Sequence, residues 1–145
     1  MARPSGDAGA QEMKLVLCRG VFDLFHVAHL RHLEEARSLG DLLVISLTPD
    51  ATAEREKRKP IIPQEERKEL LLALRCVAAV NITEKSIDDL KNLKPDIYCK
   101  GSDYLEKAHL PEEVEFCAEN GIEIVLTKPN PQTTSGIISR IKSYG

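Results

Sequence analysis

Two histidines spaced three residues apart follow the first apolar run of the chain. His26 and His29 belong to the segment RGVFDLFHVAH, and the residues after it have the apolar spacing of a helix. Side chains three residues apart share one face of a helical turn, and the free N–H groups at a helix start attract anions. Two imidazoles there can bond the oxygens of a polyphosphate and, when protonated, stabilise charge on a phosphorus that undergoes displacement.

His32 continues the series as H-x-x-H-x-x-H, a pattern that also suggests a metal site. Successive steps of three drift around a helix, and no Cys or acid stands at ligand spacing. We therefore predict no metal held by the protein itself, and we interpret His32 as a residue of the helix surface. The four cysteines form no C-x-x-C pair, so we interpret them as buried, reduced thiols.

Two further segments could bind phosphate. Thr133, Thr134 and Ser135 stand at the start of the last predicted helix, where hydroxyls are either ordinary caps or ligand contacts. Residues 53–63 (AEREKRKPIIP) are cationic and form either a solvated loop or a segment that closes over an anion. Gly20 is expected to let the chain turn tightly after the first strand.

Apolar runs and helical patterns alternate along the chain. We predict strands over residues 14–18, 41–47, 77–82, 95–100 and 122–127. We predict helices over residues 27–38, 64–75, 86–93 with Ser86 as N-cap, 111–119 and 134–143. This alternation predicts an α/β fold, a Rossmann-like, doubly wound, parallel five-stranded sheet with helices on both faces. Ligands of such sheets bind beyond the carboxyl ends of the strands. The segments that could bind phosphate fall at these ends.

Length and charge exclude several classes of protein. The 145 residues predict one domain, over 13–145, after a disordered tail over 1–12. A net charge of −3 and an aromatic content of 4% argue against a nucleic-acid partner. No apolar run approaches the ~20 residues that span a bilayer, and the first residues lack the apolar stretch of a signal peptide. We therefore predict no membrane partner and a cytoplasmic location.

The residues around the two histidines resemble a known family. G-V-F-D-x-x-H-x-x-H after a first strand is similar to the cytidylyltransferase-like nucleotidyltransferases, whose signature is H-x-G-H preceded by G-[TV]-F-D. The resemblance covers about residues 14–141. Ala28 replaces the glycine at which backbone and nucleotide approach closely, and its methyl group either crowds the nucleotide or is accommodated.

Other matches refine the branch. PDIYCKGSDY, over residues 95–104, resembles the sugar-phosphate branch, including the heptose-phosphate adenylyltransferases. Residues 133–135 match a family S-T-T segment, but the arginine that precedes it in many cytidylyltransferases is absent. Arg67 matches the family's E-x-R helix entry and is either a structural ion-pair partner or a phosphate contact. Arg75 matches a basic position that faces the second substrate in some relatives.

The resemblance implies site residues with distinct roles. The catalytic candidates are His26, His29, Lys57 and Lys59. The nucleotide-binding candidates are Gly20, Val21, Phe22, His26, Ala28, His29, Lys100, Gly101, Asp103, Thr133, Thr134 and Ser135. The substrate-binding candidates are Asp23, Arg67 and Arg75.

The resemblance also implies a reaction. The protein would transfer NMP from an NTP, either ATP or CTP, to the phosphate of a small phosphorylated substrate and release pyrophosphate. The resemblance favours a sugar phosphate as that substrate. Mg²⁺ would be bound mainly through the nucleotide, and the protein would be a homodimer. The alternatives are transfer from CTP to a polyol phosphate or phosphonate, and a non-catalytic nucleotide-binding module, which HVAH in place of H-x-G-H suggests. A receiver-like signalling domain would need an acidic cluster where this chain has histidines.

Overall fold

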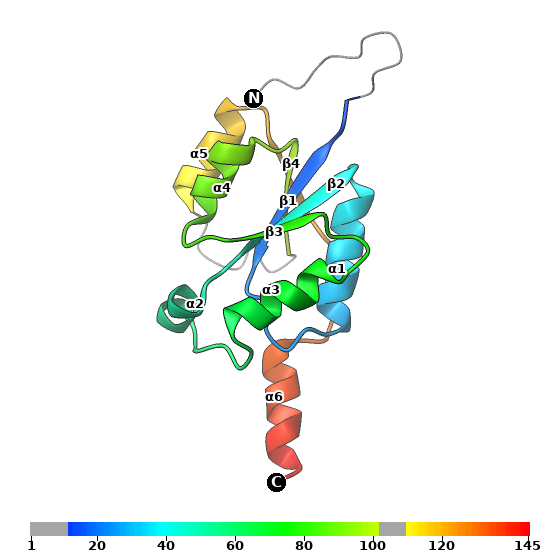
Figure 1. The fold of residues 1–145 in the computed structure, drawn as a ribbon, viewed down its shortest axis with the longest axis vertical. Coiled ribbons are helices and arrows are strands. Elements are labelled where there is room, and N and C mark those ends of the chain that lie inside the picture. The colour runs from blue at the N-terminus through cyan, green and yellow to red at the C-terminus, as the bar shows by residue number, and fades with distance from the viewer. Residues whose placement is uncertain (1–11, 102–109) are drawn as a thin grey trace.

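Five parallel strands form a single sheet in the computed structural model, which describes residues 12–101 and 110–145. The strands are β1 (Leu15–Gly20), β2 (Leu42–Leu47), β3 (Ala79–Ile82), β4 (Ile97–Lys100) and β5 (Glu123–Leu126). Their order is β3-β2-β1-β4-β5, and Figure 1 labels the first four strands of the chain. The predicted α/β, Rossmann-like sheet is confirmed. The chain reverses its direction of winding between β1 and β4, which is the ligand-binding position in such sheets.

The helices of the described residues are α1 (Val27–Ser38), α2 (Asp50–Glu56), α3 (Gln64–Leu72), α4 (Ser86–Leu93), α5 (Pro111–Glu119) and α6 (Thr134–Ser143). The bounds of α1, α4, α5 and α6 are as predicted, whereas α3 ends three residues before the predicted end at 75. α2 was not predicted, because it buries only Thr52 and Ala53 and so lacks an apolar stripe.

The core has two halves, one on each face of the sheet. Because successive strand residues point to opposite faces, Val16 and Cys18 pack with Leu33 of α1 and Leu71 of α3. Leu17 faces the other way, into the cluster that contains side chains of α4 and α5. The strands β1 and β2 are therefore buried on both sides, which explains the nearly continuous apolar run of β2.

Three helix starts show how side chains fix the βα junctions. The His26 side chain caps α1, and the Thr133 side chain caps α6 by accepting from the Gly136 N–H. The predicted N-cap of α4 is wrong by one residue. Lys85 is the N-cap, and the Ser86 hydroxyl donates to the buried carboxylate of Glu113.

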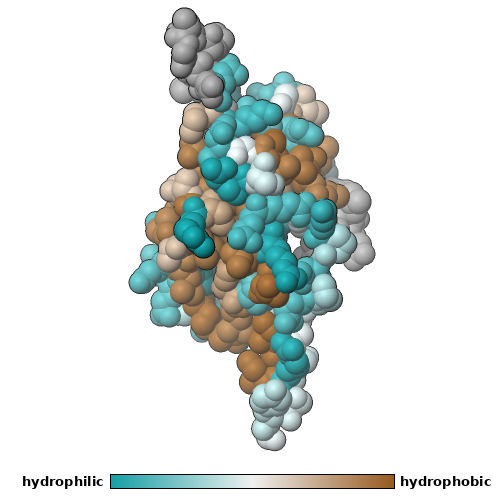
Figure 2. Space-filling view, turned by 90° about the vertical axis from the view of Figure 1, so that its right-hand side faces the viewer, coloured by the Kyte–Doolittle hydropathy of each residue, from teal (hydrophilic) through white to brown (hydrophobic). Residues whose placement is uncertain are grey.

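The last helix leaves the body of the domain. α6 projects beyond the sheet and ends at the C-terminus (Figure 1), and it buries none of its residues. Figure 2 shows the face bordered by α1, where hydrophobic residues gather on the lower part of the molecule, towards α6. Within residues 12–101 and 110–145, no helix has the length and apolar character needed to cross a membrane.

Candidate active site

A pocket of about 740 Å³ opens where the strands end. Its walls come from the turn after β1, the residues after α2, and the segment between β5 and α6. Most of the predicted site residues line it: Gly20, Val21, Phe22, Asp23, His26, Ala28, His29, Lys57, Gly101, Thr133, Thr134 and Ser135. The parallel sheet brings together segments that are up to 115 positions apart in the chain (20 to 135).

The two histidines form the first turn of α1 and stack on each other. Their ring centroids are 3.8 Å apart. The His26 Nδ1 accepts from the Ala28 N–H, and the His29 Nδ1 accepts from the His26 N–H. A neutral imidazole that accepts at Nδ1 carries its proton on Nε2. The capping interactions therefore leave both rings with an Nε2–H donor.

Burial keeps the second histidine neutral. Desolvation, followed by the repulsion of His26 and His32, lowers the pKa of His29 to about 3. Burial also lowers the pKa of His26. The free site therefore holds two uncharged N–H donors near neutral pH. An incoming polyphosphate would reverse the electrostatic balance, because a nearby anion favours the imidazolium form.

The start of α6 meets the start of α1. The His26 Nε2 lies 3.2 Å from the Thr134 Oγ1, and the Thr134 hydroxyl donates to the Asp23 carbonyl. Because the Thr134 hydroxyl donates its hydrogen to the Asp23 carbonyl, the Thr134 oxygen accepts from the His26 Nε2–H. Two helix N-termini and two imidazoles therefore converge on one wall of the pocket, an arrangement that attracts phosphate oxygens.

The turn between β1 and α1 has a strained backbone. Phe22 and Leu24 have φ angles of 53° and 48°, a region that non-glycine residues enter at a cost of roughly 1–2 kcal/mol. The expected tight turn at Gly20 is therefore displaced to these residues. Gly20 is needed for another reason, because a Cβ there would lie 2.8 Å from the Phe22 ring.

Asp23 is committed to the backbone of a neighbouring loop. Its Oδ2 accepts from the Ile61 N–H at 2.8 Å, and its Oδ1 accepts from the Ile62 N–H at 2.9 Å and the Leu24 N–H at 3.1 Å. The carboxylate is buried. Asp23 therefore ties the basic loop after α2 to the turn of the histidines, in place of the predicted contact with substrate.

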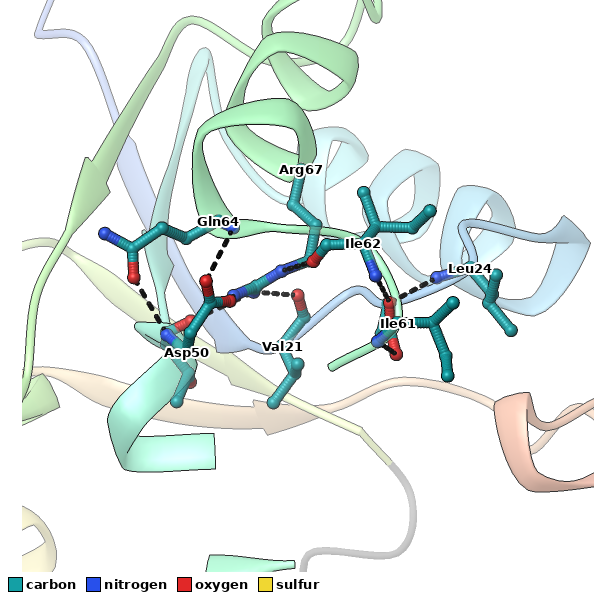
Figure 3. Close-up of polar contacts among 9 residues, drawn as sticks. Val21, Leu24, Asp50, Ile61, Ile62, Gln64 and Arg67 are labelled. Atoms are coloured by element: carbon teal, nitrogen blue, oxygen red, sulfur yellow. Dashed lines mark hydrogen bonds and ion pairs between the residues drawn. The ribbon is translucent and has the colours of Figure 1, made fainter. Parts of the chain in front are cut away.

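Arg67 lies behind the pocket wall rather than in it. The side chain is 1% exposed, and its guanidinium donates to the carbonyls of Val21 and Thr48 and to the Asp50 carboxylate at 2.6 Å (Figure 3). Its Nε donates to the Ile62 carbonyl. Of the two predicted roles the structure shows the ion pair, and the substrate-binding assignment is corrected. We call Asp23, Asp50 and Arg67 the clasp.

Lys100, predicted to bind the nucleotide, does not line the pocket. Its Nζ lies 3.4 Å from the Tyr98 hydroxyl and 4.0 Å from the buried carboxylate of Glu113. Tyr98 and Lys100 alternate with Cys99, so they face α4 and α5. Burial raises the pKa of Glu113, and Lys100 acts against that rise.

Three other predicted residues do not join the pocket. Lys59 is exposed and does not line it. Arg75 follows α3 and precedes β3, so it lies at the amino ends of the strands, opposite the pocket, and the substrate-facing role predicted for it is not met within one chain. Asp103 lies outside the described residues.

The structure adds pocket residues that the sequence analysis did not select. Arg58 lies between the two lysines that were proposed, and its buried Nε has no hydrogen-bond partner within the described parts of the chain. His32, interpreted as a surface residue, lines the pocket, and its Nδ1 lies 2.7 Å from the Thr127 Oγ1. Arg19 and Glu56 also line the wall. No local signal distinguished Arg58, because the direction of side chains after α2 depends on where that short helix ends.

Comparison with known proteins identifies relatives of the whole fold. Residues 17–140 match the family described as Cytidylyltransferase-like. The chain is 36% identical over 140 residues to the bifunctional protein HldE of Geobacter sulfurreducens and 37% identical over 135 residues to that of Helicobacter pylori. These alignments cover 94% and 90% of this chain but only 29% and 28% of the relatives.

Solved structures of other proteins share the fold of this chain. The lipopolysaccharide core biosynthesis protein of Thermoplasma volcanium is 29% identical with a TM-score of 0.68, over 81% of this chain and 98% of that protein. The pantoate-beta-alanine ligase of Francisella tularensis, at 14% identity and a TM-score of 0.51 over 91% of this chain and 70% of that protein, shares the fold. With residues 17–140 of 145 matched and the histidine turn at the end of β1, the chain belongs to the cytidylyltransferase-like family.

Proposed function

We propose that the protein is a nucleotidyltransferase that moves NMP from an NTP to the phosphate of a small phosphorylated substrate and releases pyrophosphate. The observation that carries the proposal is the meeting of the α1 and α6 N-termini at His26, with His29 stacked beside it. Phosphoryl transfer of this kind depends on positioning and on stabilisation of charge rather than on a protein nucleophile.

Each wall of the pocket has a task in this reaction. The Nε2–H of His29, and that of His26 once the phosphate replaces Thr134 Oγ1 as its acceptor, would donate to oxygens of the α-phosphate while an oxygen of the acceptor phosphate attacks it in line. The backbone N–H groups and hydroxyls at the α6 start would hold the β- and γ-phosphates. Lys57 and Arg58 would neutralise the leaving pyrophosphate. The P–O bond to the acceptor forms as the bond to pyrophosphate breaks, so no covalent enzyme intermediate is required.

Magnesium, which we propose as the partner ion, would neutralise phosphate charge when it is bound. Mg²⁺ usually keeps several waters and is held largely by substrate phosphates. The residues present fit that mode, because Asp23, the acid next to the histidine turn, has both oxygens engaged by backbone N–H groups. The ion would therefore arrive with the nucleotide.

The substrate class that we propose is a sugar phosphate, with ATP or CTP as the donor. The support is the similarity to proteins named HldE and to a lipopolysaccharide core biosynthesis protein, together with the KGSDY segment. The chain spans less than a third of those HldE relatives, so the proposal concerns this domain alone. We also propose a cytoplasmic homodimer; light scattering after gel filtration tests the dimer.

The experiment is a pyrophosphate-release assay of ATP and CTP, each with glucose 1-phosphate, mannose 1-phosphate, heptose 1-phosphate and glycerol 3-phosphate. We expect turnover with at least one sugar phosphate. Turnover with CTP and glycerol 3-phosphate alone would favour the polyol alternative. Nucleotide binding in calorimetry without turnover of any pair would favour the non-catalytic module.

The specific observation behind the module alternative is Ala28, which lines the pocket beside both histidines. Its methyl group occupies the place where the family has glycine. If the methyl group crowds the nucleotide, Ala28→Gly should raise kcat/KM about tenfold or more. If it is accommodated, the same variant should change kcat/KM by less than about threefold.

A further inference from the structure

Glu56 is an acidic side chain in a pocket wall that otherwise attracts phosphate. It ends α2 and lines the pocket beside Lys57 and Arg58. The other acid of the wall, Asp23, is saturated by backbone N–H groups. Within the described residues, no hydrogen bond or ion pair engages the Glu56 carboxylate, so both of its oxygens can accept from a ligand.

Arg19 is a second charged side chain that lines the pocket. Its guanidinium donates to the Ser46 hydroxyl at 3.1 Å, to the Glu84 carbonyl at 2.7 Å and to the Thr83 carbonyl, so it is anchored across the ends of β2 and β3. Burial lowers the pKa of Arg19, and nearby negative charge, that of Glu56 included, acts against this lowering. Both side chains line the same pocket.

Within the pocket, Arg19 and Glu56 lie apart from the two histidines and the start of α6. The histidines follow β1 and the start of α6 follows β5, and the two segments meet where His26 contacts Thr134. Arg19 instead reaches towards the ends of β2 and β3, and Glu56 belongs to α2, which follows β2. A free carboxylate repels phosphates but accepts strongly from hydroxyl groups. A carboxylate and a guanidinium that line the same pocket supply acceptors and donors together, which matches the dual character of a hydroxyl group.

We infer that Glu56, supported by Arg19, binds hydroxyl groups of the acceptor's carbohydrate portion. The inference rests on the proposed function and deepens it, because it places the acceptor on the β2–β3 side of the pocket. Two other ligands could bind the Glu56 carboxylate. The ribose of the NTP carries neighbouring hydroxyl groups, and Mg²⁺ binds carboxylates. The experiment therefore needs arms for both.

The test compares Glu56→Gln and Glu56→Ala with Glu54→Gln, a change of an exposed acid on the same helix that does not line the pocket. Steady-state kinetics are measured with two sets of acceptors, the sugar phosphate that the unmodified protein turns over best and the deoxy analogues of that sugar phosphate. The donors are ATP or CTP and the matching 2′-deoxy nucleotides. We expect Glu56→Ala to raise KM for the sugar phosphate about 10- to 100-fold, the effect of losing hydrogen bonds to a charged group. KM for the nucleotide and the Mg²⁺ requirement should change less than about twofold.

The deoxy substrates locate the hydroxyl. With the deoxy sugar phosphate that lacks the bound hydroxyl, the variant and the unmodified protein should become equal. Equality with 2′-deoxy nucleotides instead, or a raised Mg²⁺ requirement, would overturn the inference while leaving the proposed function intact. So would a variant that is kinetically the same as Glu54→Gln.

Binding provides an independent readout. Calorimetric titration of sugar phosphates into the protein saturated with a non-hydrolysable NTP analogue should show an affinity that Glu56→Ala weakens about 10- to 100-fold and Glu54→Gln preserves. Absence of any sugar-phosphate binding by the unmodified protein would also overturn the inference. Failure of the proposed function would appear differently, as absence of pyrophosphate release by the unmodified protein with every substrate pair.

Discussion

The clasp and the pocket wall that contains Arg58 and His29 use the same kinds of residue in opposite ways. In the clasp, Arg67 is buried and four of its N–H donors meet protein acceptors, one of them Asp50. In the wall, the buried Nε of Arg58 has no partner among the described residues, and the Nε2–H of His29 has none among those same residues. The fully satisfied guanidinium of Arg67 has a structural role, whereas an unsatisfied donor that lines the pocket is available to a ligand.

The largest expected effect breaks the clasp. Arg67→Met would strand Asp50 and three carbonyls, and breaking a buried ion pair costs about 3–5 kcal/mol. Urea unfolding should show this loss in the free energy of unfolding. The exposed Arg55–Glu84 pair, at 3.6 Å, provides the control, and Arg55→Met should change stability by less than about 1 kcal/mol. Equal effects of the two variants would contradict the structural assignment.

The next effect breaks the wall without breaking the fold. His29→Ala removes one preorganised donor to the transition state, so we expect kcat to fall about 10²–10³-fold. The urea midpoint should move far less than in Arg67→Met. An unchanged kcat for both His29→Ala and His26→Ala would refute the mechanism.

A smaller effect sharpens the wall to a single basic residue. Arg58→Gln should lower kcat/KM for the nucleotide about 10- to 100-fold, because it removes a charged donor that faces the pocket. Lys59→Gln, an exposed neighbour outside the pocket, is the matched control and should change kcat/KM by less than about twofold. The opposite ranking would restore the role first predicted for Lys59.

The smallest effect appears as a pH dependence of stability. Burial lowers the pKa of His29 in the folded protein to about 3. Below about pH 6.5, His29 therefore binds a proton in the unfolded chain but stays neutral in the folded protein. Neutral His29 therefore contributes stability above pH 6.5 that is lost as the pH falls towards 3. The part due to His29 should be roughly 1 kcal/mol between pH 6.5 and 5.5, or about 2–4 °C in Tm.

His29→Gln should flatten that pH dependence in scanning calorimetry. A saturating non-hydrolysable NTP should flatten it too, because bound phosphate favours the protonated imidazole. A profile that is identical in the variant and the unmodified protein would show that His29 is not desolvated in solution.

The sheet and most helices were predictable because their signals are local. Periodicity in the sequence marks α1, and continuous apolar character marks β2 as buried on both faces. α2 was missed because two small buried residues, Thr52 and Ala53, carry no periodic signal. The N-cap of α4 was misplaced because Ser86 found a stronger partner in Glu113, which is 27 residues away.

What the sequence alone determined is the fold class, the family resemblance, and the grouping of phosphate-type segments at one edge. These follow from patterns that a parallel sheet translates directly into position. Only the tertiary structure decided which charged residues line the pocket. Arg67, Arg58 and Lys59 look alike in sequence, but burial and hydrogen-bond saturation depend on contacts with distant segments: Arg67 is buried in the clasp, Arg58 turns to the pocket, and Lys59 faces solvent.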